Sequence, residues 1–373
     1  MKNKKVESVL FTPIKIGVIE IPNRFVRSAT HDFMAAHDGS ITEKHISLFE
    51  NLARGEVGLI ITGHAYINPG GKASPYQIGI CTDDLIEGLG QITEAVHRYP
   101  SRIFLQLSHA GRQTNPKLCG TTPLAPSSVY EPIFKITPKE MSHEEIKAVI
   151  GDFIQSCHRA KQAGFDGVQL HVAHGYLLSS FISPYTNRRK DEWGGPLSNR
   201  LRIVVEIIRG IKGLEGKEFP LIVKLNSSDF LPHGLKLEES IEIAKILEKE
   251  GIDAIEVSGG MAEAGKGSVW KGLRSEEEEA YFVDNAARIK KAISIPVFAL
   301  GGIRSFSVME KIIEKGKSDL ISLSRPFIRD PLMVMKFRTG MIQKSECISC
   351  NKCFNLRGIS CAELKKKGDN SEQ

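Results

Sequence analysis

The sequence predicts an α/β fold, a (β/α)8 TIM barrel with enlarged βα loops and a short cysteine-rich C-terminal tail. Short β-branched runs alternate with longer helical patterns, and eight such runs fall within roughly 330 residues. The 373 residues, 41% of them apolar, suffice for a large core. We therefore expect one large barrel over residues 1–340 and an extension over residues 341–373. A doubly wound sheet is the structural alternative.

The expected strands are short, and each is followed by a helical pattern or a long loop. They cover residues 24–28, 57–62, 102–107, 167–171, 221–225, 254–257, 297–300 and 320–323. The clearest helical patterns cover residues 140–163, 199–211, 238–250 and 282–292. Gly164, Gly251 and Gly316 each stand just before a strand, where a left-handed glycine ends a helix and turns the chain.

Two long segments, residues 108–138 and 177–198, lack a regular pattern and are expected to be lids or binding loops. No Gly-x-Gly-x-x-Gly pattern follows an expected strand, so we expect no separate dinucleotide-binding domain.

The composition argues against several classes of partner. The formal net charge of +6 is mild, and no basic stripe with interleaved aromatic residues occurs, so nucleic acid is not expected. No apolar run approaches the ~20 residues that cross a bilayer, and residues 1–9 lack the apolar stretch of a signal peptide. We expect a cytoplasmic protein without a membrane partner, and a homo-oligomer stays open.

The densest group of polar rings is His171, His174 and Tyr176, at the end of the strand expected over residues 167–171. Parallel α/β folds keep their chemistry at the carboxyl ends of strands. Two neutral imidazoles there can bind a metal ion or donate hydrogen bonds to an electron-rich oxygen, and the phenol can deliver a proton. No nearby Asp or Glu is an obvious third metal ligand, which favours the second interpretation. Two structural histidines are the alternative.

Two features late in the chain indicate a phosphate-binding loop. Gly301 and Gly302 follow the seventh expected strand, and Arg325 follows the eighth. In barrels these loops bind phosphate through bare backbone N–H groups, and an arginine adds a bidentate contact. Gln106 and Lys224 end two other strands, where an amide can read the edge of a heterocycle and a cation can stabilise a reduced ring. A surface hydrogen bond or salt bridge is the alternative for each.

Four cysteines crowd into the tail with the spacing Cys347-x2-Cys350-x2-Cys353-x7-Cys361. In a reducing compartment this spacing favours an iron–sulfur cluster or a zinc ion over disulfides. Unused thiols are the alternative.

Taken together, these motifs resemble the Old Yellow Enzyme family of flavin-dependent oxidoreductases, especially the branch that contains 2,4-dienoyl-CoA reductase and trimethylamine dehydrogenase. The matching segments span almost the whole barrel and are residues 10–17, 23–26, 106–112, 171–178, 183–195 and 324–327. The resemblance implies FMN held non-covalently at the mouth of the barrel and NAD(P)H as the reductant. The cysteine spacing is also similar to the cluster motif of the larger relatives, although its last gap is shorter, so a [4Fe–4S] cluster, a zinc ion and unused thiols all stay open for the tail.

The resemblance further implies roles for individual residues. The positions that match flavin contacts of the family are Ser28, Ala29, Thr30, Gln106, Lys224, Gly301, Gly302, Ser324 and Arg325. His171 and His174 match the pair that binds a substrate carbonyl oxygen, and Tyr176 matches the proton donor. His31 and Phe33 depart from the family pattern at positions that affect the flavin potential and the choice of substrate.

The leading hypothesis is an ene-reductase that transfers hydride from NAD(P)H through FMN to the activated C=C bond of an α,β-unsaturated carbonyl compound. The substrate would then be a small enone or enoyl compound. The alternatives are an FMN-dependent amine dehydrogenase or demethylase, a cluster-bearing electron-transfer partner, and a phosphate-binding barrel aldolase without flavin.

Overall fold

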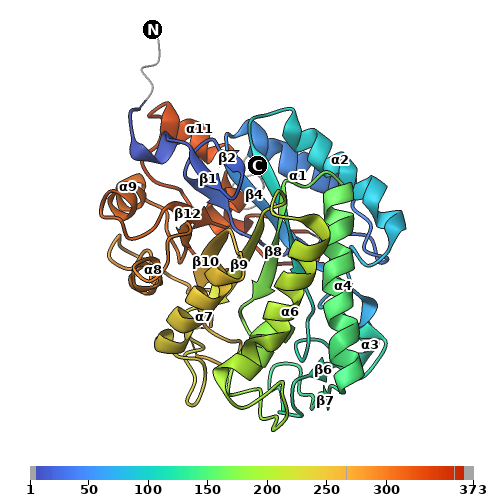
Figure 1. Cartoon of the computed structure of the whole chain (residues 1–373). Coiled ribbons are helices and arrows are strands. Elements are labelled where there is room, and N and C mark those ends of the chain that lie inside the picture. The colour runs from blue at the N-terminus through green and yellow to red at the C-terminus, as the bar shows by residue number, and fades with distance from the viewer. Residues whose placement is uncertain (1–5, 266, 357, 365–373) are drawn as a thin grey trace.

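The computed structural model describes residues 6–364 apart from 266 and 357, and its centre is a closed barrel of parallel strands (Figure 1). Around the barrel the strand order is β3-β4-β5-β8-β9-β10-β11-β12. These strands are Phe25–Arg27 (β3), Leu59–Tyr66 (β4), Arg102–Ser108 (β5), Gly167–Val172 (β8), Leu221–Asn226 (β9), Ala254–Ser258 (β10), Val297–Ala299 (β11) and Leu320–Leu323 (β12). The predicted (β/α)8 barrel is confirmed, and the doubly wound alternative is wrong because the sheet closes on itself.

Helices surround the barrel (Figure 1). They are Glu43–Arg54 (α1), Ile86–His97 (α2), His143–Gln162 (α4), Leu197–Glu215 (α6), Leu237–Lys249 (α7), Val283–Lys290 (α8), Phe306–Glu314 (α9), Arg325–Arg329 (α10) and Met333–Arg338 (α11). A capping box begins α4: the Ser142 hydroxyl accepts from Glu145 N at 3.2 Å, and the Glu145 carboxylate accepts from Ser142 N at 2.8 Å. As predicted, left-handed glycines follow α4, α7 and α9, with φ of 82° at Gly164, 94° at Gly251 and 62° at Gly316.

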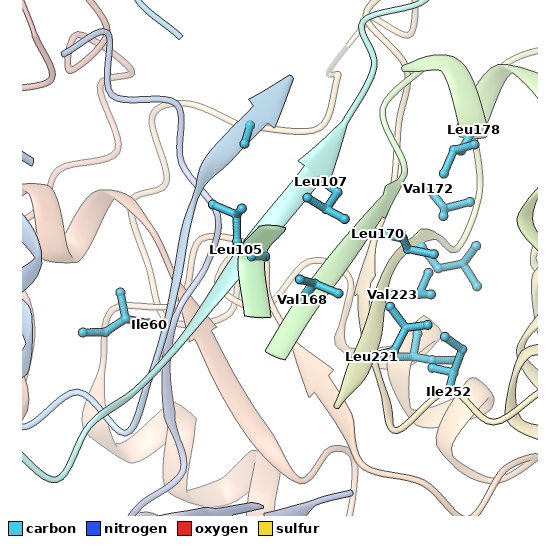
Figure 2. Close-up of a cluster of buried hydrophobic side chains, with 14 of the residues drawn as sticks. Ile60, Leu105, Leu107, Val168, Leu170, Val172, Leu178, Leu221, Val223 and Ile252 are labelled. Carbon is cyan, nitrogen blue, oxygen red and sulfur yellow. The ribbon is translucent and has the colours of Figure 1, made fainter. Parts of the chain in front are cut away.

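Side chains of the strands alternate between the barrel interior and the surrounding helices, which separates two apolar clusters. The outer cluster includes Leu105 and Leu107 of β5 and Val168 of β8 (Figure 2). The inner cluster includes Phe104 of β5 and Ile222 of β9. A short antiparallel hairpin, Ile14–Ile16 (β1) and Ile19–Ile21 (β2), adds Ile16 and Ile21 to the inner cluster. This apolar interior leaves the carboxyl end of the barrel to polar residues.

One strand is longer than its sequence pattern indicates. The prediction ended at residue 62, but β4 continues to Tyr66 past Gly63. Between Ile61 and His64 its pairing with β5 shifts register. Such an irregularity re-aims the side chains that follow it, and here it carries His64 to the carboxyl rim.

The two expected loops contain short elements of their own. Within residues 108–138 the chain forms Pro116–Cys119 (α3) and Leu124–Ala125 (β6), and β6 pairs with Lys139–Glu140 (β7). Residues 177–198 begin with Leu177–Ile182 (α5), so this segment is not a loop throughout. None of the helices within the described residues combines the length and hydrophobicity of a transmembrane segment.

The cysteine-rich tail lies against the carboxyl end of the barrel. Gly272 N donates to Ser349 O at 2.9 Å, and Ile359 N donates to Asp32 O at 2.7 Å. A side chain of the tail, Phe354, reaches the wall of the cavity described below. The domain boundary at residue 340 stays a prediction, and residues 1–5 and 365–373 lie outside the described residues.

Candidate active site

At the carboxyl ends of its strands the barrel opens into a cavity. Residues at or just beyond the ends of all eight barrel strands line it, because parallel strands share one carboxyl rim. The lining includes every residue that the sequence assigned to catalysis or to FMN, namely Ser28, Ala29, Thr30, Gln106, His171, His174, Tyr176, Lys224, Gly301, Gly302, Ser324 and Arg325. The structure thus brings together residues that span almost 300 positions of the chain.

A tight turn after β8 gathers the three predicted catalytic rings. His174 and Gly175 have φ of 64° and 81°, so the chain reverses and Tyr176 returns beside His171. The ring centroids of His171 and Tyr176 are 4.6 Å apart, and those of His171 and His174 are 5.2 Å apart. A left-handed conformation is unfavourable for histidine, and it is stabilised here by Asn226 Oδ1, which accepts from His174 N at 3.2 Å.

The protonation states of these rings follow from their burial. Desolvation holds the pKa of His171 well below its ordinary value, and His174 and Lys224 lower it further. Burial lowers the pKa of His174 to about 3 and raises the pKa of Tyr176 to about 12. At neutral pH the imidazoles are therefore uncharged and the phenol keeps its proton. His171 Nδ1 is buried and has no hydrogen-bond partner among the described residues, so it is available to a ligand.

A third imidazole, which the sequence analysis missed, belongs to the same wall. The His64 ring lies 5.2 Å from Tyr176 and 6.2 Å from His171, measured between centroids. Gln77 Nε2 lies 2.9 Å from His64 Nδ1 and also donates to the His64 carbonyl at 3.0 Å, which fixes the ring. Burial holds the pKa of His64 well below its ordinary value. Its position near the end of a strand could have identified His64, but the expected strand ended at residue 62, because Gly63 is typical of a strand terminus.

The two predicted phosphate-loop glycines adopt conformations that only glycine tolerates well. Gly301 has φ of 125° and Gly302 has φ of 73°. A Cβ on Gly302 would lie 2.2 Å from Leu273 Cδ1, so the loop is packed tightly from behind. Across the loop, the hydroxyls of Thr30 and Ser324 are 2.7 Å apart. This wall therefore offers backbone and hydroxyl groups rather than bulky side chains.

Arg325 provides a direct test of whether the site suits a phosphate. It is buried, with 6% exposure, and no carboxylate within the described part of the chain forms an ion pair with it. Its Nη1 donates to Trp270 O at 2.8 Å and to Asn351 Oδ1 at 2.6 Å. These neutral acceptors hold the guanidinium at the cavity wall without balancing its charge. A buried, unbalanced cation is unfavourable, and an anionic group in the cavity would relieve it.

The floor of the cavity is a buried ion pair that the sequence analysis gave only in part. Lys224 Nζ lies 3.2 Å from a Glu256 carboxylate oxygen and donates to Ser28 Oγ at 2.9 Å. Burial alone would raise the pKa of Glu256, but Lys224 and the hydroxyls of Ser322 and Ser28 outweigh it and lower that pKa. The floor thus pairs Lys224 with a carboxylate whose pKa is lowered. The wall formed by Gly301, Gly302 and Arg325, the polar floor and Gln106 together fit FMN, which combines a phosphate with a polar ring edge.

The four tail cysteines influence one another but do not form a metal site as they stand. Burial raises the pKa of Cys353 to about 11, and the neighbouring Cys347, Cys350 and Cys361 raise it too. Arg329 Nη1 lies 3.7 Å from Cys361 Sγ. Within the described residues, no three ligand-type side chains are arranged to hold a metal ion. The iron–sulfur cluster stays a prediction.

Fold and site together are those of a barrel suited to a phosphorylated heterocyclic cofactor. Residues 9–344 match the sequence model of the NADH:flavin oxidoreductase / NADH oxidase family. The chain belongs to this family, the Old Yellow Enzyme family to which its motifs pointed.

Two relatives show how far the similarity extends. An NADH oxidase from Thermoanaerobacter brockii is 39% identical over 345 residues, which are 92% of this chain and 52% of the relative. An NADPH dehydrogenase from Bacillus subtilis (strain 168) is 37% identical over 323 residues, which are 86% of this chain and 92% of the relative.

Two solved structures share the barrel. A 2-naphthoyl-CoA reductase in complex with 2-naphthoyl-CoA has a TM-score of 0.86 at 30% identity, covering 92% of this chain and 54% of that one. An old yellow enzyme homologue from Zymomonas mobilis has a TM-score of 0.78 at 28% identity, covering 91% and 95%. The chain spans about half the length of the NADH oxidase and of the 2-naphthoyl-CoA reductase.

Proposed function

We propose that this protein is an FMN-dependent ene-reductase, which uses NAD(P)H to reduce the activated C=C bond of an α,β-unsaturated carbonyl compound. The observation that carries the proposal is the wall of two uncharged imidazoles and one protonated phenol, His171, His174 and Tyr176. Family membership supports the flavin and the nicotinamide. When bound, FMN supplies hydride transfer between nicotinamide and alkene.

In this proposal, one group of cavity residues holds the cofactor and another, His171, His174 and Tyr176, faces the substrate. Arg325 and the backbone of Gly301 and Gly302 would hold the cofactor phosphate, which would supply the anion that the buried guanidinium lacks. Gln106 would hold the polar edge of the cofactor ring, with Lys224 beneath it as a source of positive charge.

His171 and His174 donate hydrogen bonds to the carbonyl oxygen of the substrate. Because the imidazoles are uncharged and buried, their N–H groups are directional donors in a poorly solvated site. Such a donor, aimed at an oxygen that gains charge in the transition state, lowers the barrier by about 3–4 kcal/mol in other enzymes. Ser258 Oγ lies 2.7 Å from His174 Nε2, so the Nδ1 side of that ring is left for the substrate.

Tyr176 gives its proton to the α-carbon of the substrate. Its raised pKa keeps it protonated throughout the neutral range, as a general acid requires. The phenolate left behind regains a proton before the next turnover.

The Tyr176→Phe variant tests this role in two separate half-reactions under anaerobic conditions. Alkene reduction should slow by about 100-fold or more, while flavin reduction by the nicotinamide stays unchanged, because only the first needs the proton. Tyr66→Phe is the matched control, since Tyr66 does not line the cavity and its hydroxyl donates to Asp38 O at 2.6 Å. Equal losses in both half-reactions of the Tyr176 variant would remove Tyr176 from the acid role.

A substrate screen under the same anaerobic conditions separates the ene-reductase from the amine dehydrogenase. Amines that bleach the oxidised flavin without any nicotinamide would favour the amine enzyme. Enones and enoyl thioesters both belong in the screen, because the similar 2-naphthoyl-CoA reductase was solved with an acyl-CoA.

We also propose that the tail binds an iron–sulfur cluster, supported by the spacing of its four cysteines. Anaerobic purification should then yield about four iron and four sulfide ions per chain. Cys350→Ser should lower both contents. Iron-free protein after reconstitution with iron and sulfide would refute the cluster.

A further inference from the structure

Beneath the cavity, a chain of three buried side chains links β10 through β8 to β5. Glu256 Oε2 accepts a hydrogen bond from Gln169 Nε2 at 2.9 Å. Gln169 Oε1 in turn accepts one from Gln106 Nε2 at 2.7 Å. Glu256 and Gln169 are fully buried, and Gln106 alone of the three lines the cavity. These two hydrogen bonds therefore connect the buried carboxylate of Glu256 to Gln106 at the cavity wall.

The charge at one end gives this chain a direction. A carboxylate only accepts hydrogen bonds, whereas an amide has one donating and one accepting end. Lys224 at 3.2 Å, and the Ser28 and Ser322 hydroxyls at 2.7 and 2.5 Å, all stabilise Glu256 in its ionised form. Gln169 must therefore turn its NH2 group toward Glu256.

The direction passes on to the cavity. With its NH2 group toward Glu256, Gln169 turns its oxygen toward Gln106. Gln106 must therefore donate a hydrogen bond to that oxygen from its own NH2 group. The oxygen of Gln106 and its second N–H remain for a ligand, in a fixed order. Reversing the Gln106 amide would place its oxygen against the Gln169 oxygen in a buried site, which is unfavourable because neither atom can donate a hydrogen bond.

We propose that Glu256 and Gln169 are positioning residues, which fix the amide of Gln106 so that the cavity accepts a ring edge with an N–H beside a carbonyl oxygen. The inference rests on the proposed function, because the pyrimidine edge of an isoalloxazine ring has this pattern. The selectivity comes from the unpaired polar groups that a reversed edge would leave. Neither residue has to contact the ligand.

The test is a set of FMN dissociation constants, measured on the apoprotein by fluorescence titration. Gln169→Leu breaks the chain and should weaken FMN binding about five- to tenfold. Gln169→Glu should restore binding to within about twofold of the wild type. A carboxyl group at this position keeps its proton beside ionised Glu256, donates it there and still turns an oxygen to Gln106.

A double-mutant cycle shows whether the effect passes through Gln106. In a Gln106→Leu background, Gln169→Leu should cause no further loss of FMN affinity. Thr93→Val is the matched control, because it removes a buried hydrogen bond, from Thr93 Oγ1 to Ala163 O at 2.7 Å, far from the cavity. It should lower the thermal midpoint and leave FMN binding unchanged.

Each outcome decides the matter. Equal weakening by Gln169→Leu and Gln169→Glu, or an undiminished effect in the Gln106→Leu background, would overturn the proposal. Wild-type protein that does not bind FMN would overturn the proposed function as well, whereas normal binding in every variant overturns only the positioning role. Should Gln169→Leu fail to fold, Glu256→Gln replaces it in the same cycle with Gln106→Leu, which separates an effect through Gln106 from one through Lys224. An amide at 256 both donates and accepts, so direction is lost, and unchanged FMN binding there would refute the role.

Discussion

Replacing Arg325 by methionine should weaken FMN binding strongly and yet leave the apoprotein almost as stable as the wild type. The reason is that Arg325 is buried with 6% exposure and has no carboxylate partner among the described residues. Its charge is therefore unfavourable to the empty protein and favourable only to a bound anion. Methionine keeps most of the length and apolar volume of the side chain.

The magnitudes follow from the contacts. A guanidinium–phosphate pair with two charge-assisted hydrogen bonds is worth about 3 kcal/mol, which is roughly a 100-fold change in the dissociation constant. In the apoprotein the variant loses two bonds to neutral acceptors, Trp270 O and Asn351 Oδ1. It also loses an unbalanced buried charge, whose desolvation costs several kcal/mol. These effects oppose each other, so the thermal midpoint should shift by less than about 3 °C.

The assay combines an FMN fluorescence titration with a thermal melt of the apoprotein. Arg329→Met is the control, because Arg329 lies one turn further along α10, pairs with Glu346 and does not line the cavity. It should leave the FMN dissociation constant unchanged. An Arg325 variant that binds FMN within about threefold of the wild type would refute a phosphate contact by Arg325, since 3 kcal/mol corresponds to a far larger change in the dissociation constant.

Three further predictions rest on single features of the site. Burial lowers the pKa of His31 to about 4 and of His174 to about 3, whereas histidines in the unfolded chain titrate near 6.5. The stability of the apoprotein should therefore hold above pH 6.5 and fall as the pH drops toward 4, because the unfolded chain then binds more protons. A urea midpoint that is flat from pH 7.5 to 4.5 would contradict this. His64→Ala should leave FMN affinity unchanged and shift the ratio of kcat/KM values toward bulky enones by about tenfold, because it opens space beside His171 and Tyr176. An unchanged ratio would place His64 outside the substrate region. Gly302→Ala should lower the free energy of unfolding in a denaturation assay by about 1–3 kcal/mol, because Gly302 has a φ of 73° and a Cβ there would lie 2.2 Å from Leu273 Cδ1. Gly151→Ala in α4 is the control and should cause no loss, because no atom lies within 4 Å of the added Cβ.

Much of the fold was predictable because its signals are local. Each βα unit carries its own apolar run, helical pattern and terminating glycine within a few dozen residues, and Gly164, Gly251 and Gly316 all adopt the left-handed conformation expected of them. The end of β4 was not predictable in this way. Gly63 reads as a terminator in the sequence, but pairing with β5 carries the strand through it to Tyr66, and that pairing is a property of the closed sheet.

In the candidate site, too, some features were predictable from the sequence and others were not. The sequence by itself determined which residues stand at strand ends, and in a parallel barrel this places His171, Gln106 and Arg325 on a common rim. Only the tertiary structure decided how buried side chains pair beneath that rim. Glu256 and Gln169 are 87 residues apart, and an isolated acid within an apolar strand gives no sign of its partners. Such hydrogen bonds depend on tenths of an ångström between side chains that come from different strands, here β8 and β10 with β9 between them, and that geometry exists only once the barrel has closed.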